Sequence, residues 1–158
     1  MKTLNAGGGN YKARPVANGI LVVDDDPLIC ELIRDALESA EIKSKTTSDS
    51  NRASMLIRKE KFDAVFLDVR MPAADGIALA RQVRASALNR TTPITMITGE
   101  SDGGLLAKLF EAGATFALFK PIDSHCLLRL LRVSEDVIQR EHRQFQRVKI
   151  TRKDPPAQ

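Results

Sequence analysis

Five polar residues of this sequence each follow a short apolar run, which is where reactive side chains are presented in folds built from parallel strands. They are Asp24, Asp25, Asp68, Thr98 and Lys120. If the runs form neighbouring parallel strands, three carboxylates converge, and their repulsion raises their pKa values unless positive charge compensates. Lys120 supplies one such charge, and a hard divalent cation with oxygen ligands, such as Mg²⁺, would supply the rest.

The chemistry that suits this set is phosphoryl transfer. A carboxylate is an established nucleophile toward phosphorus, with which it forms an aspartyl phosphate. The hydroxyl of Thr98 and the compact charge of Lys120 are groups that a phosphoryl on a nearby oxygen requires. Taken singly, each residue has an ordinary role, since an Asp at a strand end is usually a helix cap, as we expect for Asp26. Their joint occurrence favours a phosphoryl site.

The surrounding segments predict five strands that alternate with helices. Strands are expected at 20–23, 41–47, 64–67, 94–98 and 116–119, and helices are expected to begin after Asp26, after Ser48 or Asp49, after Gly76, after Gly104, and after Asp123 or Ser124. This alternation predicts an α/β fold, a doubly wound five-stranded parallel sheet in the flavodoxin-like order 2-1-3-4-5. In that order the first and third strands are neighbours, so their terminal acids meet.

Two elements carry further expectations. The segment 41–47 holds Lys43 and Lys45 and is expected to be an exposed edge strand protected by its lysines. The helix after Asp26 is expected to bury the side chains that share one face at helical spacing. They are Leu28, Ile29, Leu32, Ile33, Ala36 and Leu37.

Length and composition bound the class of protein. A chain of 158 residues suggests one domain, and 43% hydrophobic with 28% charged residues is ordinary for a globular protein. Two cysteines are too few for a disulfide framework, and the sequence shows neither a membrane-spanning run nor a signal peptide. We therefore expect a cytoplasmic protein with no membrane association.

The charge is concentrated in the terminal segments. Residues 1–18 contribute +3 and residues 140–158 contribute +4 to a net charge of +4, which leaves −3 on the body between them. The basic segment VKITRKD near the C-terminus is an alternative contact for nucleic acid, but no base-reading motif accompanies it. Nucleic acid is therefore an unlikely partner.

The chain is expected to divide into four parts. These are a flexible leader at 1–18, the globular domain at 19–132, an extension of the last helix at 133–150 and a disordered basic tail at 151–158. Apolar residues follow a broken heptad spacing from Leu127 to Val148, which makes a homodimer or a docked partner on this lengthened helix a hypothesis. The alternative is a solvated amphipathic helix.

Four segments resemble the response-regulator receiver domain of two-component signalling, in the order that the family has them. They are GILVVDDDP at 19–27, FLDVRMPAADG at 66–76, ITMITGES at 94–101 and ALFKPID at 117–123. The resemblance covers about 19–132. It implies that Asp68 takes a phosphoryl group from a histidine kinase or a phosphotransfer protein, and that the domain then switches its contacts with a downstream protein target.

The resemblance also implies the ligand set. Asp24, Asp25 and Asp68 would hold Mg²⁺, with Mn²⁺ as a substitute, and the backbone carbonyl of Arg70 would be a further ligand. Charge on the transferring phosphoryl oxygens would then be met by the metal and by one ammonium group.

Further roles follow from the same resemblance on the phosphoryl side of the site. Thr98 would bond one phosphoryl oxygen and Lys120 would pair with another, and the bond between Lys120 and Pro121 would be cis.

Two features depart from or add to the family pattern. The family usually places an aromatic switch residue three positions before the lysine, where this chain has Ala117, and we expect Phe116 and Phe119 to point to the opposite face of the strand. Arg70 and Glu100 flank the route of a hydrolytic water and could pair with each other. We hypothesise that they tune the lifetime of the aspartyl phosphate.

The output of the domain is expected to be a protein contact. Only about 25 residues follow the body, too few for a winged helix or a catalytic domain, so we expect a stand-alone regulator that is not a turnover enzyme. One alternative is a non-cycling pseudo-receiver that serves as an interaction module. Another is a phosphohydrolase of the haloacid-dehalogenase type, whose paired acids Asp24 and Asp26 match in spacing alone.

Overall fold

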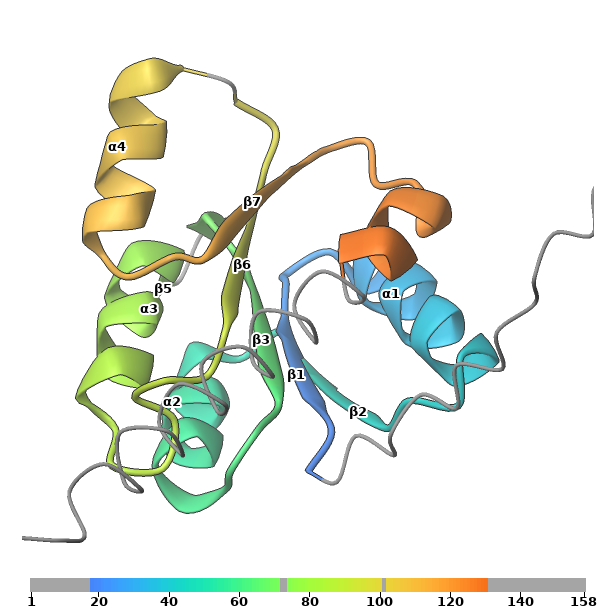
Figure 1. Ribbon diagram of the computed structural model, residues 1–158, viewed down its shortest axis with the longest axis horizontal. Coiled ribbons are helices and arrows are strands. Elements are labelled where there is room, and N and C mark those ends of the chain that lie inside the picture. The colour runs from blue at the N-terminus through green and yellow to red at the C-terminus, as the bar shows by residue number, and fades with distance from the viewer. Residues whose placement is uncertain (1–17, 72–73, 101, 131–158) are drawn as a thin grey trace, which may run out of the picture.

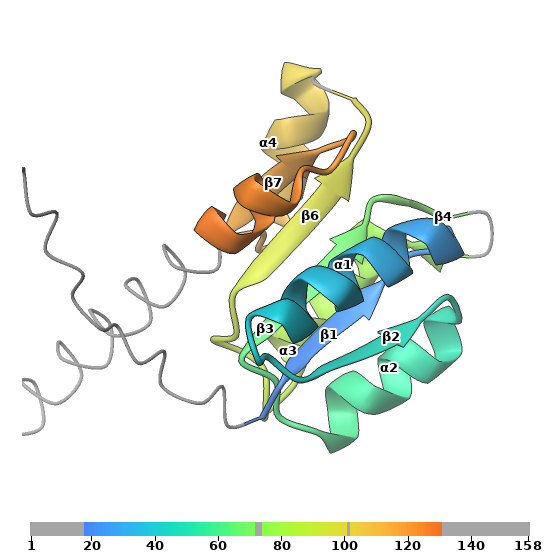
Figure 2. The same ribbon diagram turned by 90° about the vertical axis from the view of Figure 1, so that its right-hand side faces the viewer.

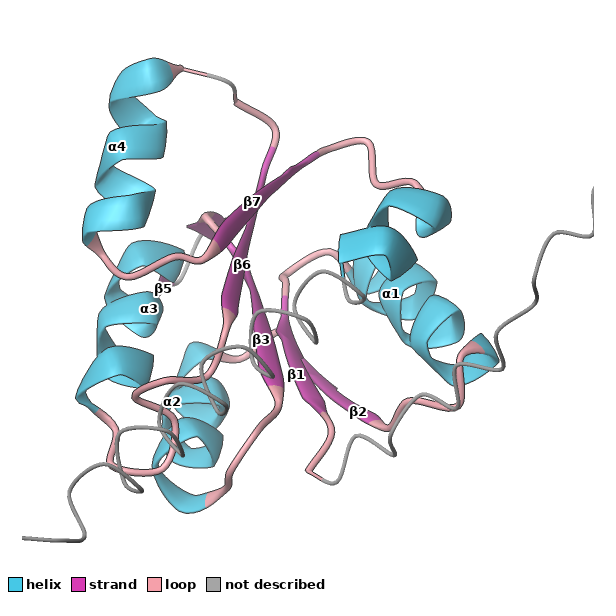
Figure 3. Cartoon of the chain, viewed as in Figure 1, coloured by secondary structure: helices cyan, strands magenta, loops and turns pink. Residues whose placement is uncertain are grey.

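The computed structural model describes residues 18–71, 74–100 and 102–130. Strands and helices alternate along them, as the cartoon shows (Figure 3). In chain order the elements are β1 (Ile20–Val23), α1 (Pro27–Ser39), β2 (Ser44–Thr47), α2 (Ser50–Lys59), β3 (Ala64–Asp68), β4 (Arg70–Met71), β5 (Ala74–Asp75), α3 (Gly76–Ala85), β6 (Ile94–Thr98), α4 (Gly103–Glu111) and β7 (Phe116–Phe119). A further helical segment occupies 124–130.

The five main strands form one parallel sheet in the order β2-β1-β3-β6-β7, which confirms the predicted doubly wound topology (Figure 1). β4 and β5 form a separate two-stranded antiparallel ladder that the sequence did not predict. β1, β3 and β6 lie inside the sheet and are buried along their whole length, as expected of strands covered on both faces. β2 is the predicted edge strand.

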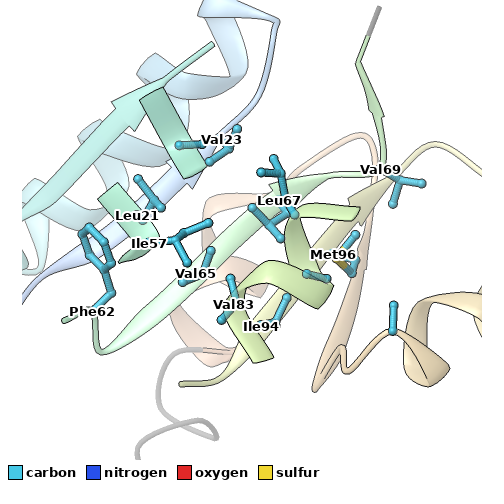
Figure 4. Close-up of a cluster of buried hydrophobic side chains, with 14 of the residues drawn as sticks. Leu21, Val23, Ile57, Phe62, Val65, Leu67, Val69, Val83, Ile94 and Met96 are labelled. Atoms are coloured by element: carbon cyan, nitrogen blue, oxygen red, sulfur yellow. The ribbon is translucent and has the colours of Figure 1, made fainter. Parts of the chain in front are cut away.

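Two apolar clusters cover the two faces of the sheet. One joins alternate residues of β1, β3 and β6 to α2, α3 and α4, and Figure 4 shows it around Leu67 and Met96. The other joins the intervening residues, Val22 and Phe66 among them, to α1 and the segment 124–130. Figure 2 shows α1 and the helical segment 124–130 on the same side of the sheet. Burial of each large side chain contributes roughly 1.5–3 kcal/mol relative to exposure.

Aspartates begin all four labelled helices. Asp26, Asp49, Asp75 and Asp102 each accept a hydrogen bond from the backbone amide two residues on, so each satisfies one unpaired donor at a helix N-terminus. The predicted cap at Asp26, with Pro27 in the first helical position, is confirmed. α3 and α4 begin at Gly76 and Gly103, slightly earlier than expected, because the acid before each glycine acts as the cap.

Two details of the predicted elements were wrong. β2 begins at Ser44 instead of Glu41, because Glu41 has a φ of 59° in the turn that leaves α1. Leu28 and Leu32 are 72% and 38% exposed, so the buried face of α1 is narrower than its apolar stripe and consists of Ile33, Ala36 and Leu37. Predictions about residues 1–17 and 131–158 lie outside the described part of the chain.

Candidate functional site

The parallel register of β1 and β3 sets two buried acids side by side. Val23 pairs with Leu67, so Asp24 and Asp68, the next residues, leave the sheet at the same level. Asp24 is 0% and Asp68 3% exposed, which is unusual for carboxylates because burial without full pairing is costly. Asp25 joins them from the exposed side, and one carboxylate oxygen from each of the three acids lies within 4.8 Å of the others. The predicted convergence of the three acids is therefore found.

Two oxygens of this cluster lack a hydrogen-bond donor. Asp24 Oδ1 accepts from the Asp26 amide at 2.9 Å, but Asp24 Oδ2 and Asp68 Oδ2 are buried and accept no hydrogen bond. A buried oxygen without a donor is destabilising, and such an atom in a folded protein calls for an explanation. A hard cation with oxygen ligands would provide one, so the donor set fits Mg²⁺.

Lys120 brings an ammonium group that contacts both buried acids. Its backbone amide donates to the Thr98 carbonyl at 2.8 Å, which fixes the end of β7 beside β6. Its Nζ lies 3.4 Å from Asp68 Oδ1 and 3.5 Å from Asp24 Oδ2. The Lys120–Pro121 peptide bond that follows is cis. One ammonium does not neutralise three carboxylates, so the site keeps an excess of negative charge.

Burial and crowding shift the acids away from ordinary behaviour. Burial, followed by the charge of Asp24, raises the pKa of Asp68 from 3.8 to about 6. Burial also raises the pKa of Asp24, although its hydrogen bond from Asp26 and the charge of Lys120 act in the opposite direction. Burial lowers the pKa of Lys120, but the charges of Asp24 and Asp68 outweigh it and the net shift is upward. The acids are therefore poised to gain a proton or a cation.

Thr98 ends β6 level with this cluster, but its hydroxyl is engaged elsewhere. Thr98 is 2% exposed. Its Oγ1 accepts from the Glu100 amide at 3.1 Å and lies 3.4 Å from the Glu100 carbonyl oxygen, to which it donates. Both of these side-chain hydrogen bonds are with the loop that follows β6. The sequence placed the residue at the right strand end, but it could not predict the direction of the hydroxyl.

Arg70 and Glu100 form the pair that the sequence suggested. The guanidinium of Arg70 contacts both carboxylate oxygens, with Nε 2.9 Å from Oε1 and Nη2 2.9 Å from Oε2. The side chains are 72% and 45% exposed. This two-point contact joins the segment after β3 to the loop after β6, on either side of the strand ends that carry Asp68 and Thr98.

Gly76 is a positioning residue that sequence reasoning treated only as a loop marker. A Cβ at this position would clash with the carbonyl oxygen of Asp68, so only glycine allows α3 to begin against the backbone of Asp68. Its amide also donates to the Val69 carbonyl at 3.2 Å. The signal available was a glycine just after the Asp75 cap, a few residues beyond the strand.

The expected orientation of one aromatic residue was wrong. Met96 pairs with Ala117 and Thr98 pairs with Phe119, so Ala117 and Phe119 share one face of β7. Phe116, which alternates with them, lies on the other face as expected. Phe119 is 43% exposed. The position three before Lys120 therefore lacks an aromatic ring, while a ring stands two residues later on the same face.

Comparison with known proteins gives one consistent family. The family described as response regulator receiver domain matches residues 20–132. The C4-dicarboxylate transport transcriptional regulatory protein DctD of Pseudomonas aeruginosa is 32% identical over 118 residues, which are 75% of this chain and 25% of that protein. The regulatory protein VanRB of Enterococcus faecalis is 33% identical over 70% of this chain and 49% of its own length. The chain thus spans a quarter to a half of these two relatives.

Solved structures show the same fold. The chemotaxis protein CheY4 of Vibrio cholerae superposes with a TM-score of 0.70 and 30% identity, over 73% of this chain and 96% of that one. The receiver domain of a sensor histidine kinase from Pseudomonas aeruginosa PAO1, with magnesium ion coordinated in its active site cleft, gives a TM-score of 0.67 and 29% identity over 73% and 94%. Within the described residues, none of the helices is long and apolar enough to cross a bilayer.

Proposed function

Because the chain belongs to the response regulator receiver domain family, we propose that it is a phosphorylation-dependent switch whose phosphoacceptor is Asp68. The observation that carries this proposal is the buried cluster of Asp24 and Asp68, with Asp25 beside it and Lys120 in contact with both buried acids. A structural ion pair would not need three carboxylates around one ammonium. A site for a cation and a phosphoryl group would.

The proposed reaction is a transfer between two side chains. A carboxylate oxygen of Asp68 forms a bond to phosphorus while the bond from phosphorus to the donor's histidine nitrogen breaks, and the nitrogen keeps the electron pair. Lys120, 3.4 Å from Asp68 Oδ1, is placed to pair with a phosphoryl oxygen. The reaction creates a covalent mark on the domain, and we propose no other catalytic turnover.

Three carboxylates and one carbonyl are the groups that would hold the metal. Asp68 Oδ2 is buried without a hydrogen bond, Asp24 Oδ2 is buried with only the 3.5 Å contact to the Lys120 ammonium, and Asp25 offers an oxygen within 4.8 Å of both residues' oxygens. The carbonyl of Arg70 is the proposed fourth protein ligand. When bound, Mg²⁺ or Mn²⁺ would neutralise charge on the phosphoryl oxygens. Phosphorylation would then require the metal. The magnesium ion coordinated in the active site cleft of the related kinase receiver domain supports a metal site here.

The partners are proposed from the family and from the relatives. One matched domain belongs to a sensor histidine kinase, which supports a histidine kinase or a phosphotransfer protein as donor. We propose a protein as the downstream target, in the cytoplasm. The homodimer through the last helix stays a prediction, because most of that segment lies outside the described residues.

The Arg70–Glu100 pair is the basis of a proposal about lifetime. The two side chains stand beside the strand ends that carry Asp68 and Thr98. We propose that they control how a hydrolytic water reaches the aspartyl phosphate. Their two-point contact supports this proposal, because it fixes the two side chains relative to each other in the segments that follow Asp68 and Thr98.

The test of the proposed function is phosphorylation by acetyl phosphate, followed by intact mass spectrometry. The protein with Mg²⁺ should gain the mass of one phosphoryl group. Asp68→Asn should gain none, and protein in EDTA should gain far less. As a matched control, Asp63→Asn changes an acid at the opposite end of β3, where it accepts bonds from Asn18 and Gly19, and should be labelled like the parent.

Absence of any mass shift in the parent protein would favour the non-cycling interaction module. Ala117 stands in place of the usual aromatic switch residue, and this observation favours the non-cycling interaction module as a second candidate function. The phosphohydrolase alternative loses its main support, because Asp26 caps α1 by accepting from Leu28.

A further inference from the structure

The hydroxyl of Thr98 makes the same local turn as a second threonine at the end of another strand. Thr47 ends β2, and its Oγ1 accepts from the Asp49 amide at 3.1 Å and lies 3.4 Å from the Asp49 carbonyl oxygen. Thr98 and Glu100 repeat these two distances at the end of β6. The turn is therefore an ordinary way to end a strand, and it does not distinguish Thr98.

The two turns differ in what their last residue contacts. Asp49 caps the helix that immediately follows it, by accepting from Asn51. Glu100 instead reaches across to Arg70, with two contacts of 2.9 Å, and so ties the loop after β6 to the segment after β3. A bidentate guanidinium–carboxylate contact is the most geometrically restrictive of ion pairs. The backbone atoms of Glu100 that hold the Thr98 hydroxyl are thus held in turn by Arg70.

We propose that Glu100 is a positioning residue that keeps the Thr98 hydroxyl bonded to the loop after β6 for as long as it is paired with Arg70. We refer to the ion pair and the Thr98–Glu100 hydrogen bonds together as the Glu100 link. Opening the Glu100 link frees the loop after β6, and Thr98 can then turn its hydroxyl to a phosphoryl oxygen on Asp68. The inference rests on the proposed function, because the second position of the Thr98 hydroxyl requires a phosphoryl group on Asp68.

The Glu100 link and a direct effect of charge predict opposite changes in affinity for an anionic ligand at Asp68 when Arg70 is replaced. Removal of the Arg70 guanidinium takes a positive charge away from an anionic ligand at Asp68, so direct electrostatics predicts weaker binding. The Glu100 link predicts tighter binding, because the loop is released. Removal of the Glu100 carboxylate strengthens binding under both explanations. Arg70→Gln is therefore the informative variant, and it leaves the backbone carbonyl of residue 70 in place.

The first experiment uses the metal-free protein and the γ-methyl signals of its threonines in NMR. Couplings to the methyl carbon report the χ1 rotamer of Thr98, which should be fixed in the parent and averaged in Glu100→Gln and Arg70→Gln. Thr47 is an internal control, since the last residue of its identical turn, Asp49, caps α2 and neither substitution touches it, so its rotamer should not change. A Thr98 rotamer that stays fixed in both variants overturns the proposal.

The second experiment measures binding of beryllofluoride, a phosphoryl mimic, in the presence of Mg²⁺ by calorimetry. We expect Arg70→Gln and Glu100→Gln each to bind roughly two- to fivefold more tightly, the range that an exposed ion pair of good geometry supports, and the double variant to bind no more tightly than either. Both gains should vanish in a Thr98→Val background. Lys45→Gln, which breaks the exposed pair with Glu60, should match the parent.

Failure of the positioning role of Glu100 and failure of the proposed function give different results in these experiments. Weaker binding by Arg70→Gln, or gains that persist in Thr98→Val, overturn the positioning role while leaving Asp68 as phosphoacceptor. No binding of beryllofluoride by the parent protein contradicts the proposed function instead. The rotamer measurement needs no ligand and still decides whether Glu100 positions Thr98.

Discussion

Replacing the phosphoacceptor by its neutral isostere should stabilise the metal-free protein. Asp68 is nearly fully buried beside Asp24, and its pKa is raised from 3.8 to about 6. At about 1.4 kcal/mol for each tenfold change in proton affinity, this rise corresponds to about 3 kcal/mol of unfavourable free energy for the ionised side chain at neutral pH. Asp68→Asn removes that charge and keeps the shape. We expect the variant to be more stable by about 1–3 kcal/mol.

The pH dependence of this gain has a defined sign. A carboxyl group whose pKa is raised by folding contributes stability below its unfolded value of 3.8, and this contribution is lost as the pH rises through about 6. The parent protein should therefore lose stability relative to Asp68→Asn between pH 4 and pH 7. Above that range the difference should be constant, because Asp68 is then ionised in both the folded and the unfolded state.

Urea unfolding followed by circular dichroism measures the effect, in EDTA and at several pH values. Mg²⁺ should stabilise the parent by mass action and narrow its gap to the variant. Glu111→Gln removes an exposed carboxylate at the end of α4 and should change stability by no more than about 0.5 kcal/mol. A variant no more stable than the parent in EDTA at pH 7.5, or a gap that does not change between pH 4 and pH 7, would refute the reasoning.

Three further predictions follow from the same geometry. Gly76→Ala places a Cβ against the Asp68 carbonyl oxygen and should cost at least about 2 kcal/mol of unfolding free energy in urea, whereas Gly103→Ala, whose Cβ meets nothing within 4 Å, should be neutral or slightly stabilising. Equal effects of the two substitutions would contradict the close approach. Binding of Mg²⁺ to the metal-free protein should weaken as the pH falls from 7 to 5, because Asp68, with a pKa of about 6, becomes protonated and the proton competes with the metal; a Mg²⁺ affinity that calorimetry finds independent of pH would disprove this. Arg70→Ala should change the half-life of the aspartyl phosphate by a factor of about two or more, measured by loss of the label, and an unchanged half-life would exclude lifetime tuning by this residue.

The sequence was sufficient for the parts of the fold that depend on strong periodic patterns. The buried strands that end at Asp68 and Thr98 have continuous apolar runs, and neighbouring carboxyl ends must share one edge of a parallel sheet. This alone predicted that Asp24, Asp68 and Lys120 would meet. The ends of the elements were less certain, because a local turn decided them at Glu41.

The sequence could not predict the direction of individual side chains, or where two backbone segments pack against each other. The hydroxyl of Thr98 has two possible roles at a strand end, and only the geometry shows that it bonds to Glu100. The exposure of Leu28 depends on which part of the apolar stripe of α1 packs in the folded domain, which no local pattern encodes. The approach of Gly76 to the Asp68 carbonyl is likewise a property of the folded chain.

The central claim is that Asp68 carries the phosphoryl group, and chemical trapping tests it most directly. Borohydride reduces an aspartyl phosphate to homoserine, and the residue so converted can be located by peptide mass spectrometry after treatment with acetyl phosphate and Mg²⁺. We predict homoserine at position 68 and at no other aspartate. Homoserine at Asp24 or Asp25, or no conversion in protein that has gained a phosphoryl group, would contradict the assignment.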